Sequence, residues 1–158
     1  MKRPWNIVDM PVYSLATYPG GEVNMNICTY VSAVSMKPKL FMVAIDYHTK
    51  TYQNLECTDG AVLQVLHQQH AELVPLLGKR SGKKVNKLEK LERKELVDEW
   101  QGHSVLAGAC AYLLLKTKQR MNIGGDHELF YFEVEKSTTK SETGILMFQD
   151  LIKKGIIL

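Results

Sequence analysis

The sequence has few cysteines and no long hydrophobic run. Cys28, Cys57 and Cys110 form no Cys-x-x-Cys pair and no zinc-type cluster with histidine, which argues against a metal centre and a disulfide framework. The longest apolar run, Val105–Leu115, is far shorter than a membrane-spanning helix requires. No apolar stretch follows the basic N-terminus, so we expect no export signal, no membrane partner and a cytoplasmic location.

Common catalytic and nucleotide-binding sequence motifs are also missing. The chain contains no Gly-x-Ser-x-Gly, His-Glu-x-x-His, Walker-type or Gly-x-Gly-x-x-Gly motif. Redox chemistry would therefore have to come from a cofactor, and a nicotinamide would not bind through a Rossmann unit. The net charge of +3 is too small to indicate nucleic acid. A small nucleic-acid-binding barrel using the lysines of residues 79–90 is the weakest functional alternative, and we expect no nucleic-acid partner.

The pattern of apolar and turn residues indicates a mainly β protein with short helices. Strands are predicted over residues 11–18, 23–34, 40–45, 61–66, 104–119 and 129–134, with a bend or bulge at Gly108. Helical segments are predicted over 51–57 with Thr51 as the cap, over 69–77 with Pro75 opening a second short helix, and over 78–99 on the surface.

Such short-range alternation of strands and turns favours antiparallel pairing in a closed or half-closed barrel, which removes exposed sheet edges. An open α+β sheet with helices on one face is the competing architecture. The 158 residues suit a single domain, 1–158.

Four polar clusters could carry chemistry. Residues 24–35 place Asn, Thr and Ser in an apolar strand, which suits hydrogen bonds to a planar heterocycle or a strand with one wet face. Residues 48–54 combine hydroxyls, an amide and a base, which suits a phosphate or an ordinary helix start. The lysines of residues 81–87 could offset a phosphate or form a solvated surface. Residues 124–128 place a histidine at a hairpin tip, where histidines are usually just exposed.

Taken together and in this order, the four clusters resemble the flavin reductase-like family with the FMN-binding split barrel, including its flavoredoxin-like branch. The match runs from about Pro11 to about Leu151. Its positions are Pro11-Val12, Asn24, Thr29-Tyr30, Ser35-Met36-Lys37-Pro38, Thr51 with Asn54, Ser81-Gly82 with Lys87, and Gly125-Asp126-His127. The resemblance implies an antiparallel split β-barrel of Greek-key type.

The resemblance also implies a cofactor and a site. FMN is the expected cofactor, with FAD as the alternative and NAD(P)H as a co-substrate. The residues expected to line the ring and ribityl chain are Asn24, Thr29, Tyr30 and Ser35. Those expected near the phosphate are His48, Thr51 and Asn54, with Lys87 as a cation beside the flavin or its phosphate and His127 facing the cofactor. No residue is expected to act as an acid, base or nucleophile.

Two functions follow from the resemblance. The first is an oxidoreductase of the NAD(P)H:flavin reductase type, and the second is an electron carrier or flavin-binding protein without its own nicotinamide site. The family implies a homodimer with the flavin at the interface and a redox partner protein. The sequence departs from the family pattern at Tyr30, Lys39 and Tyr131-Phe132-Glu133, which leaves open the substrate or partner that meets the flavin.

Overall fold

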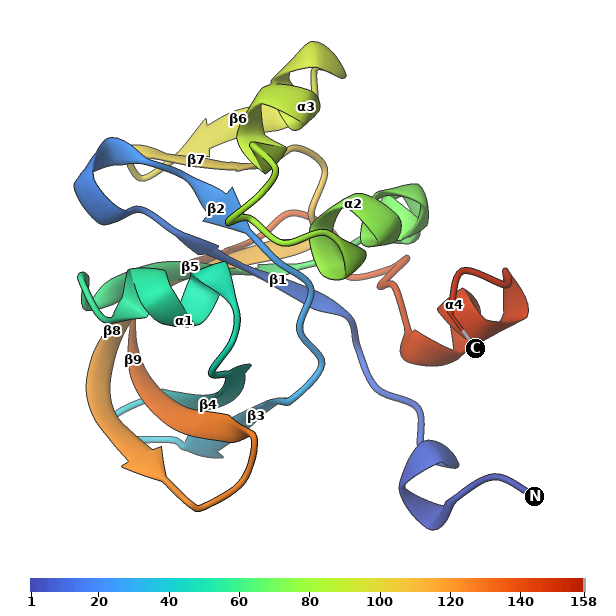
Figure 1. Cartoon of the computed structure of the whole chain (residues 1–158), viewed down its shortest axis with the longest axis horizontal. Coiled ribbons are helices and arrows are strands. Elements are labelled where there is room, and N and C mark those ends of the chain that lie inside the picture. The colour runs from blue at the N-terminus through green and yellow to red at the C-terminus, as the bar shows by residue number, and fades with distance from the viewer. Residues whose placement is uncertain (158) are drawn as a thin grey trace.

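The computed structural model describes residues 1–157 and shows a seven-stranded antiparallel sheet, a separate two-stranded hairpin and short helices (Figure 1). The strands are β1 Tyr13–Thr17, β2 Asn24–Met25, β3 Val31–Ser35, β4 Leu40–Asp46, β5 Gly60–Val65, β6 Val97–Trp100, β7 His103–Leu106, β8 Ala111–Asn122 and β9 His127–Thr139. The helices are α1 Lys50–Leu55, α2 Val74–Lys79, α3 Lys87–Arg93 and α4 Phe148–Lys153, with 3-10 turns η1 Pro4–Asn6, η2 Pro19–Gly21 and η3 Gln68–Leu73. The predicted mainly β class with short helices is confirmed.

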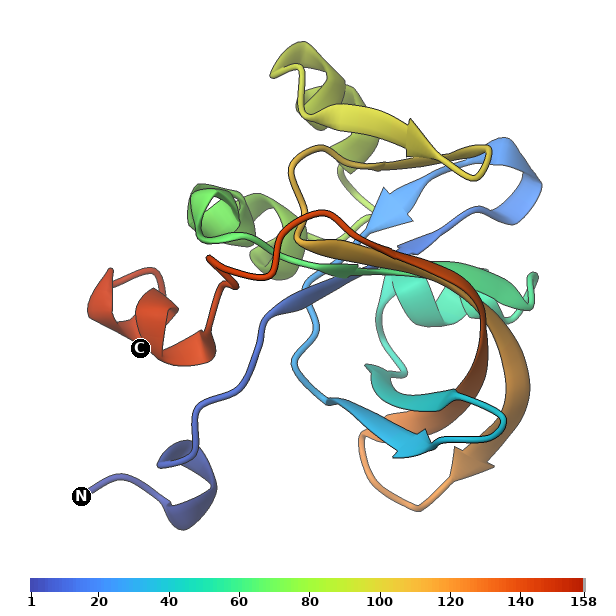
Figure 2. The same ribbon diagram turned by 180° about the vertical axis from the view of Figure 1, so that it is seen from behind.

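The two longest strands, β8 and β9, form the centre of the sheet, whose order is β2-β1-β5-β8-β9-β4-β3. One half of β8 also pairs with β5, and the opposite half of β9 pairs with β4. The register shifts at Leu114/Leu115 and at Thr117/Gln119 are bulges, which bend a strand and increase its twist. Seen from behind, both strands curve from one half of the sheet into the other (Figure 2). The sheet therefore curls into a half-closed barrel instead of lying open.

The single strand predicted over residues 23–34 is wrong, because the chain leaves the sheet in the middle of this stretch. β2 pairs with β1 at one edge of the sheet, whereas β3 pairs with β4 at the other edge. Between them Asn26 accepts the Leu15 N–H through its side-chain oxygen at 2.8 Å. Only Cys28 forms a backbone bridge, with Tyr13. The stretch thus connects the two edges of the half-closed barrel.

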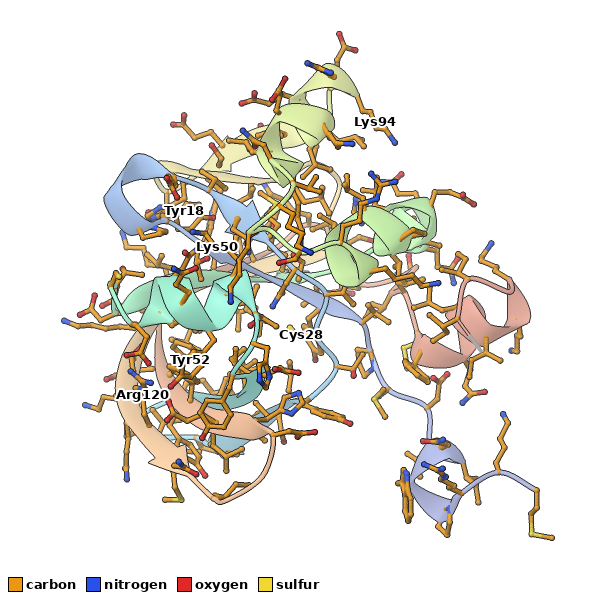
Figure 3. The ribbon with its side chains drawn as sticks, viewed as in Figure 1. Tyr18, Cys28, Lys50, Tyr52, Lys94 and Arg120 are labelled. Atoms are coloured by element: carbon orange, nitrogen blue, oxygen red, sulfur yellow. The ribbon has the colours of Figure 1, made fainter. Side chains whose placement is uncertain are left out.

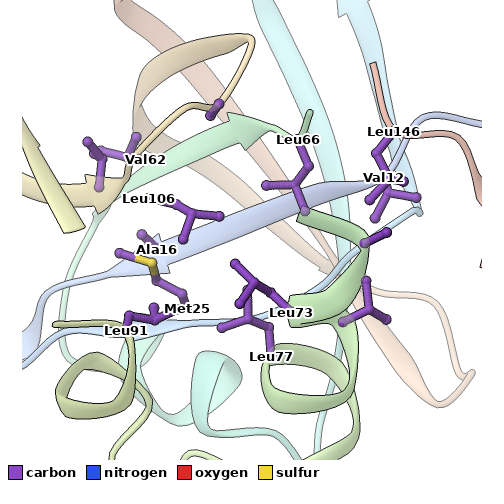
Figure 4. Packing of buried hydrophobic residues seen from close by; sticks show 14 of the residues in the cluster. Val12, Ala16, Met25, Val62, Leu66, Leu73, Leu77, Leu91, Leu106 and Leu146 are labelled. Atoms are coloured by element: carbon purple, nitrogen blue, oxygen red, sulfur yellow. The ribbon is translucent and has the colours of Figure 1, made fainter. Parts of the chain in front are cut away.

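Alternating side chains of the central strands pack on both faces of the sheet. Ala16 and Val62 point into a core beneath α2 and α3, shown in Figure 4, while Leu15 and Leu63 point into the barrel interior. The barrel interior is filled by the buried rings of Phe130 and Phe132, together with aliphatic side chains. Burial of one such side chain contributes about 1.5–3 kcal/mol. The two cores fix the positions of the connecting segments that cross between them.

Three predicted elements differ from the structure for local reasons. The cap of α1 is Thr49 and not Thr51, because the Thr49 hydroxyl accepts the Tyr52 N–H at 3.2 Å. The helix predicted over 78–99 shrinks to α3, since the backbone turns at Glu95 with φ +57° and then enters β6. The strand predicted over 104–119 is split into β7 and β8 at Gly108, whose φ is +80°. The predicted bend at this glycine is therefore a complete break.

The second short helix that was predicted to begin at Pro75 is present as α2. Residues 68–73 form a 3-10 turn, and Pro75 stands in the first turn of α2. A proline is tolerated there because the missing N–H has no partner within the helix.

One arginine joins α1 to the β8–β9 hairpin. Arg120 contacts the carboxylates of Glu56 and Glu128, the latter at 2.6 Å, and donates to the Tyr52 hydroxyl at 3.0 Å. Its guanidinium also lies 4.8 Å from the centre of the Phe130 ring. Figure 3 shows Arg120 and Tyr52 side by side where the curved strands pass α1. This cluster holds the helix against the β8–β9 pair, next to the register shift at Thr117/Gln119.

We expect Arg120→Met to lower the free energy of unfolding by about 2 kcal/mol, because it leaves the buried Glu128 carboxylate without its partner. Lys118→Met is the matched control, since Lys118 pairs with Glu133 on the surface and its loss should cost less than about 1 kcal/mol. Urea unfolding of both variants measures the difference. Equal losses would contradict the assigned role of Arg120.

The same cluster predicts a pH dependence. Hydrogen bonding to Arg120 lowers the pKa of Glu56 below its ordinary value. The Glu56–Arg120 pair therefore stabilises the fold fully at pH values above that ordinary pKa. The difference in unfolding free energy between wild type and Arg120→Met should therefore become smaller as the pH falls below about 4.

Candidate functional site

A groove runs along the segment that connects the two sheet edges, and it consists of three adjoining hollows. The central hollow, about 260 Å³, is lined by residues 24, 26, 27, 48–51, 77–82 and 87. The outer hollow, about 160 Å³, is lined by residues 26–30, 44–46, 49 and 127. The basic hollow, about 470 Å³, is lined by residues 21–24, 50 and 82–88. Shared lining residues make the three hollows continuous.

The N-terminus of α1 forms one wall of the central hollow. Thr49 caps the helix and also donates its hydroxyl to the Asp46 carbonyl at 2.8 Å. This anchoring places Lys50 and Thr51 on the groove. Thr51 is buried, and its hydroxyl accepts from the Asn24 amide at 3.3 Å, which ties the helix to β2. The wall is therefore attached to β4 through Thr49 and to β2 through Thr51.

The segment of residues 78–86 forms the opposite wall and packs closely on the first. A Cβ built on Gly82 would lie 2.1 Å from the Asn24 side-chain oxygen, so a larger residue at this position would have to displace the Asn24 amide. Ser81 holds the loop in a tight turn, because its carbonyl accepts the N–H groups of Lys84 and Val85 at 3.0 and 3.1 Å.

Lys87 lies at the base of the groove and is buried. Its ammonium donates to the carbonyls of Met25 at 3.1 Å and Leu77 at 2.7 Å, which joins β2 to α2. Among residues 1–157 it forms no salt bridge to a carboxylate. Burial without a counter-ion lowers the pKa of Lys87 from 10.5 to about 8. The groove is thus built over a positive charge that nearby side chains do not neutralise.

The outer hollow is flanked by an aromatic ring and a histidine. Tyr30 is 58% exposed, and its ring centre lies 5.3 Å from that of His127. His127 stands opposite Asp46 in the β4–β9 ladder and contacts Asp126 at 2.6 Å. Burial raises the pKa of the Cys28 thiol to about 12, so this cysteine stays protonated and is a poor nucleophile. The hollow offers flat contact surface and hydrogen-bonding groups instead of an activated nucleophile.

The structure brings most of the predicted site residues together. The predicted residues that line the groove are Asn24, Thr29, Tyr30, His48, Thr51, Lys87 and His127. Ser35 lies outside it, at the end of β3 beside a register shift. Asn54 also lies outside it, because its amide donates to the buried Thr17 hydroxyl at 2.9 Å and links α1 to β1.

Several lining residues lie in the predicted clusters or the basic run but were not named as ligand contacts. Asn26, Thr49, Lys50 and Arg80 face the hollows. The signal for Thr49 and Lys50 was their place directly before Thr51, which the prediction used as the cap. Arg80 belongs to the basic run next to the predicted Ser81-Gly82. No local signal distinguishes Asn26 from any other polar residue of its stretch.

Comparison with known proteins identifies the family of this chain and its fold. The family model described as flavin reductase like domain matches residues 5–153. A search of curated protein sequences gave no match.

Several solved structures share the fold. An FMN-binding protein from Thermus thermophilus is 20% identical with a TM-score of 0.76, covering 89% of this chain and 76% of its own. The NADH:FAD oxidoreductase of Streptomyces globisporus C-1027 is 21% identical with a TM-score of 0.75, covering 89% and 81%. The flavoredoxin of Methanosarcina acetivorans is 18% identical with a TM-score of 0.75, covering 89% and 75%. The predicted split barrel is therefore confirmed.

Two further features are absent from residues 1–157. No group of three or more His, Cys, Asp or Glu side chains there could hold a metal ion. No described helix is long and apolar enough to cross a membrane.

The buried charge of Lys87 predicts a pH dependence of stability. Because the pKa of Lys87 is lower in the folded chain, the unfolded chain binds more protons between about pH 8 and pH 10.5, and stability rises with pH in that window. The unfolding free energy of wild type minus that of Lys87→Met should therefore increase by about 2 kcal/mol across it. Denaturant unfolding at several pH values measures this difference. Lys90→Met, at an exposed position, should show no such increase, and a flat difference for Lys87→Met would contradict the assignment.

Proposed function

The chain belongs to the flavin reductase-like family, and we propose on this basis that it binds FMN in the groove as an NAD(P)H-dependent flavin oxidoreductase. In this proposal the phosphate occupies the central hollow, and the ring system lies over the outer hollow. FAD is the alternative flavin. The final acceptor is a small molecule or a redox partner protein.

The observation that carries the proposal is the charge of the central hollow. Its lining includes the cationic side chains of Lys50, Lys79, Arg80 and Lys87 and no carboxylate. A phosphate with a charge of roughly −1.5 to −2 would offset the buried ammonium of Lys87 and the nearby cations. The hydroxyl of Ser81 lies on the same lining and supplies a hydrogen-bond donor. The residues present therefore fit a phosphate monoester.

The outer hollow fits the planar end of the same ligand. Tyr30 and His127 present rings at its mouth, and Thr29 adds a hydroxyl. Aromatic rings favour stacked or edge contacts with flat heterocycles. Asn26 and Thr49 line both hollows, so one elongated molecule would reach from the cations to the rings.

When bound, the flavin would accept a hydride from NAD(P)H and pass electrons on. The residues of this chain would then hold and orient the ligand. Lys50 and Arg80 would bind the phosphate, while Tyr30 and His127 would fix the plane of the ring. Cys28 stays protonated below the ring site and takes no part as a nucleophile. The proposal thus needs no acid, base or nucleophile from the protein.

A homodimer with the flavin at its interface is part of the proposal. Large apolar side chains are exposed in and directly beside β3 and at the end of β8 and the turn that follows it. They are Tyr30, Val34, Met36, Met121 and Ile123. Exposed apolar patches of this kind mark association surfaces. Analytical ultracentrifugation of the flavin-loaded chain should give twice the mass of one chain, and a purely monomeric species would refute the dimer.

The reaction is tested by anaerobic titration of FMN-loaded protein with NADH and then NADPH. Bleaching of the oxidised flavin band near stoichiometric addition is expected and would identify the donor. A band that persists with both donors, but is lost with a reduced ferredoxin-type donor, would instead assign the electron-carrier function. Failure to load any flavin would refute the proposal that the cofactor is a flavin.

The phosphate site is tested by comparing two ligands. Lys50→Ala combined with Arg80→Ala should weaken FMN binding by at least about tenfold, because charge-assisted hydrogen bonds contribute about 1.5–3 kcal/mol each. Riboflavin lacks the phosphate, so its affinity should change less than about twofold. Quenching of flavin fluorescence measures both constants. An equal loss for the two ligands would place the phosphate elsewhere.

A further inference from the structure

We propose that residues 1–8, the N-terminal arm, pack on a second copy of this chain and place Trp5 beside the outer hollow of that copy. The inference rests on the proposed flavin site and deepens it, because it adds to the site an aromatic ring from the other chain. The arm of each copy would reach the other copy, so each site is complete only in the dimer.

The first argument is that the arm has a defined backbone but buries none of its side chains. Residues 1–9 are all exposed, and Trp5 and Ile7 are 67% and 66% accessible. The backbone nevertheless forms the 3-10 turn η1, in which the Asn6 N–H donates to the Arg3 carbonyl at 2.9 Å. Ordering a chain costs conformational entropy, and burial of apolar side chains offsets that cost. The arm therefore needs a surface on which to bury them.

The second argument is that the direction of the arm is fixed by one glutamine of α4. The Gln149 side-chain oxygen accepts from the Lys2 ammonium at 2.9 Å, and its amide donates to the Asn6 carbonyl at 3.3 Å. Its backbone N–H also donates to the Asp9 carboxylate at 2.9 Å. The turn held in this way projects away from the body of the chain (Figures 1 and 2). A preorganised turn loses less entropy on binding than a mobile tail, which favours its use as a contact.

The third argument is the distribution of exposed apolar side chains. Within residues 1–157 the large ones fall into two groups, one in the arm and one in and beside β3 and after β8. The members of the first group are Met1, Trp5, Ile7 and Val8, and those of the second are Tyr30, Val34, Met36, Met121 and Ile123. In a twofold-symmetric dimer every contact occurs twice, so the arm of each copy can cover the second group of the other. A second copy thus accounts for both groups with one interface.

The fourth argument is the open edge of β3. This strand is the last of its sheet, pairs only with β4 and exposes the side chains of Ser32, Ala33 and Val34. Residues 31–35 contain no charged residue and no proline, which are the usual means of protecting an edge strand. Cover by another chain protects such an edge equally well. The surface that the arm would meet is therefore one that itself needs a partner.

Charge complementarity decides which end of β3 the arm meets. The arm carries Lys2 and Arg3, neither of which forms a salt bridge within the described part of the chain. At the outer hollow the carboxylate of Asp46 is partly exposed and that of Asp126 is largely exposed. The far end of β3 leads into residues 37–39, which include two lysines. The cations of the arm are therefore attracted to the outer hollow and repelled from the far end.

This placement brings the partner's Trp5 beside Tyr30 and His127. Those two rings flank the outer hollow with their centres 5.3 Å apart, and Tyr30 remains largely exposed. An indole would add a third flat apolar surface there, and aromatic rings favour contacts with flat heterocycles. Trp5 would thus contact the ring system of the flavin and not its phosphate.

The first test is the dimer dissociation constant of the full chain, measured by sedimentation equilibrium. We expect Trp5→Ala to raise this constant by at least about tenfold, because a buried tryptophan is a frequent hot spot of interfaces. The matched control is Trp100→Phe, since Trp100 stacks on Tyr112 within the chain and should not affect the dimer. The far-UV circular dichroism of Trp5→Ala should stay that of wild type, because Trp5 buries nothing in the single chain. A wild-type chain that is purely monomeric would overturn the inference.

The second test identifies the surface that the arm meets. Lys2→Glu/Arg3→Glu should raise the dimer dissociation constant by about tenfold, and adding Asp126→Arg to the same chain should restore most of the loss. The matched control is Lys90→Glu/Lys94→Glu, which reverses the same charge on α3 and its end. Figure 3 shows Lys94 at the opposite end of the molecule from the arm, so this control should keep the wild-type constant. If Asp126→Arg restores nothing, the arm does not meet the outer hollow and the inference is overturned.

The third test is the affinity for riboflavin, measured at protein concentrations at which the dimer persists. Trp5→Ala should weaken riboflavin and FMN binding alike, by about threefold, because the lost contact is to the ring system. This result would differ from that of Lys50→Ala/Arg80→Ala, which should affect FMN alone. Unchanged riboflavin affinity would overturn the placement of Trp5 beside the outer hollow.

Failure of this inference can be told apart from failure of the proposed function. If flavin binds, but Trp5→Ala changes neither the dimer nor the affinity for riboflavin, the arm serves another surface, such as a different protein or a lipid. The inference is then overturned while the flavin site stands. If Trp5→Ala weakens the dimer, but no flavin binds to any form, the contact between arm and second copy is supported and the flavin proposal is overturned.

Discussion

Backbone pairing between β8 and β9 holds the two halves of the sheet together, and every feature of the groove depends on it. Each strand is long enough to serve both halves, and the bulges at Leu114/Leu115 and Thr117/Gln119 let the pair bend without losing its hydrogen bonds. Because the pair curves, the two edges of the sheet, formed by β2 and β3, are close enough for residues 26–30 to connect them. The chain between those edges then has to leave the sheet, and the candidate site lies along it. Arg120 stabilises the bend through α1, the element that also supplies a wall of the groove.

The polar residues of the groove are arranged in two ways. The Asn24 amide donates to Thr51 and lies against the backbone at Gly82, so these residues shape the walls of the groove. Lys50 and Arg80 also line the central hollow, and Lys50 pairs with the exposed Glu22 carboxylate at 3.9 Å. Residues of the first kind position the site, whereas residues of the second kind would contact a ligand. Replacing a residue of the first kind would disturb the walls of the groove, so a loss of affinity there would not by itself show a ligand contact.

Local signals in the sequence predicted the parts of the fold that local chemistry decides. Pro75 opens α2 and Gly108 interrupts a strand because φ is restricted in one case and positive in the other. The break at Asn26 could not be predicted, because it depends on a hydrogen bond to Leu15 in another strand. Lys87 shows the same limit at the site. It resembles its exposed neighbours in the lysine-rich run, and only the packing of β2 against α2 reveals it as buried.

The uncompensated charge of Lys87 also has a consequence for the protein in a cell. A ligand anion that binds only the folded chain stabilises it by mass action, to an extent set by its free concentration. Proteases act on the unfolded fraction, so small changes in stability alter the amount of protein several-fold. A chain with this buried cation would therefore persist when its anionic ligand is plentiful and be degraded when the ligand is scarce. The same lysine that shapes the groove would couple the abundance of the protein to its ligand supply.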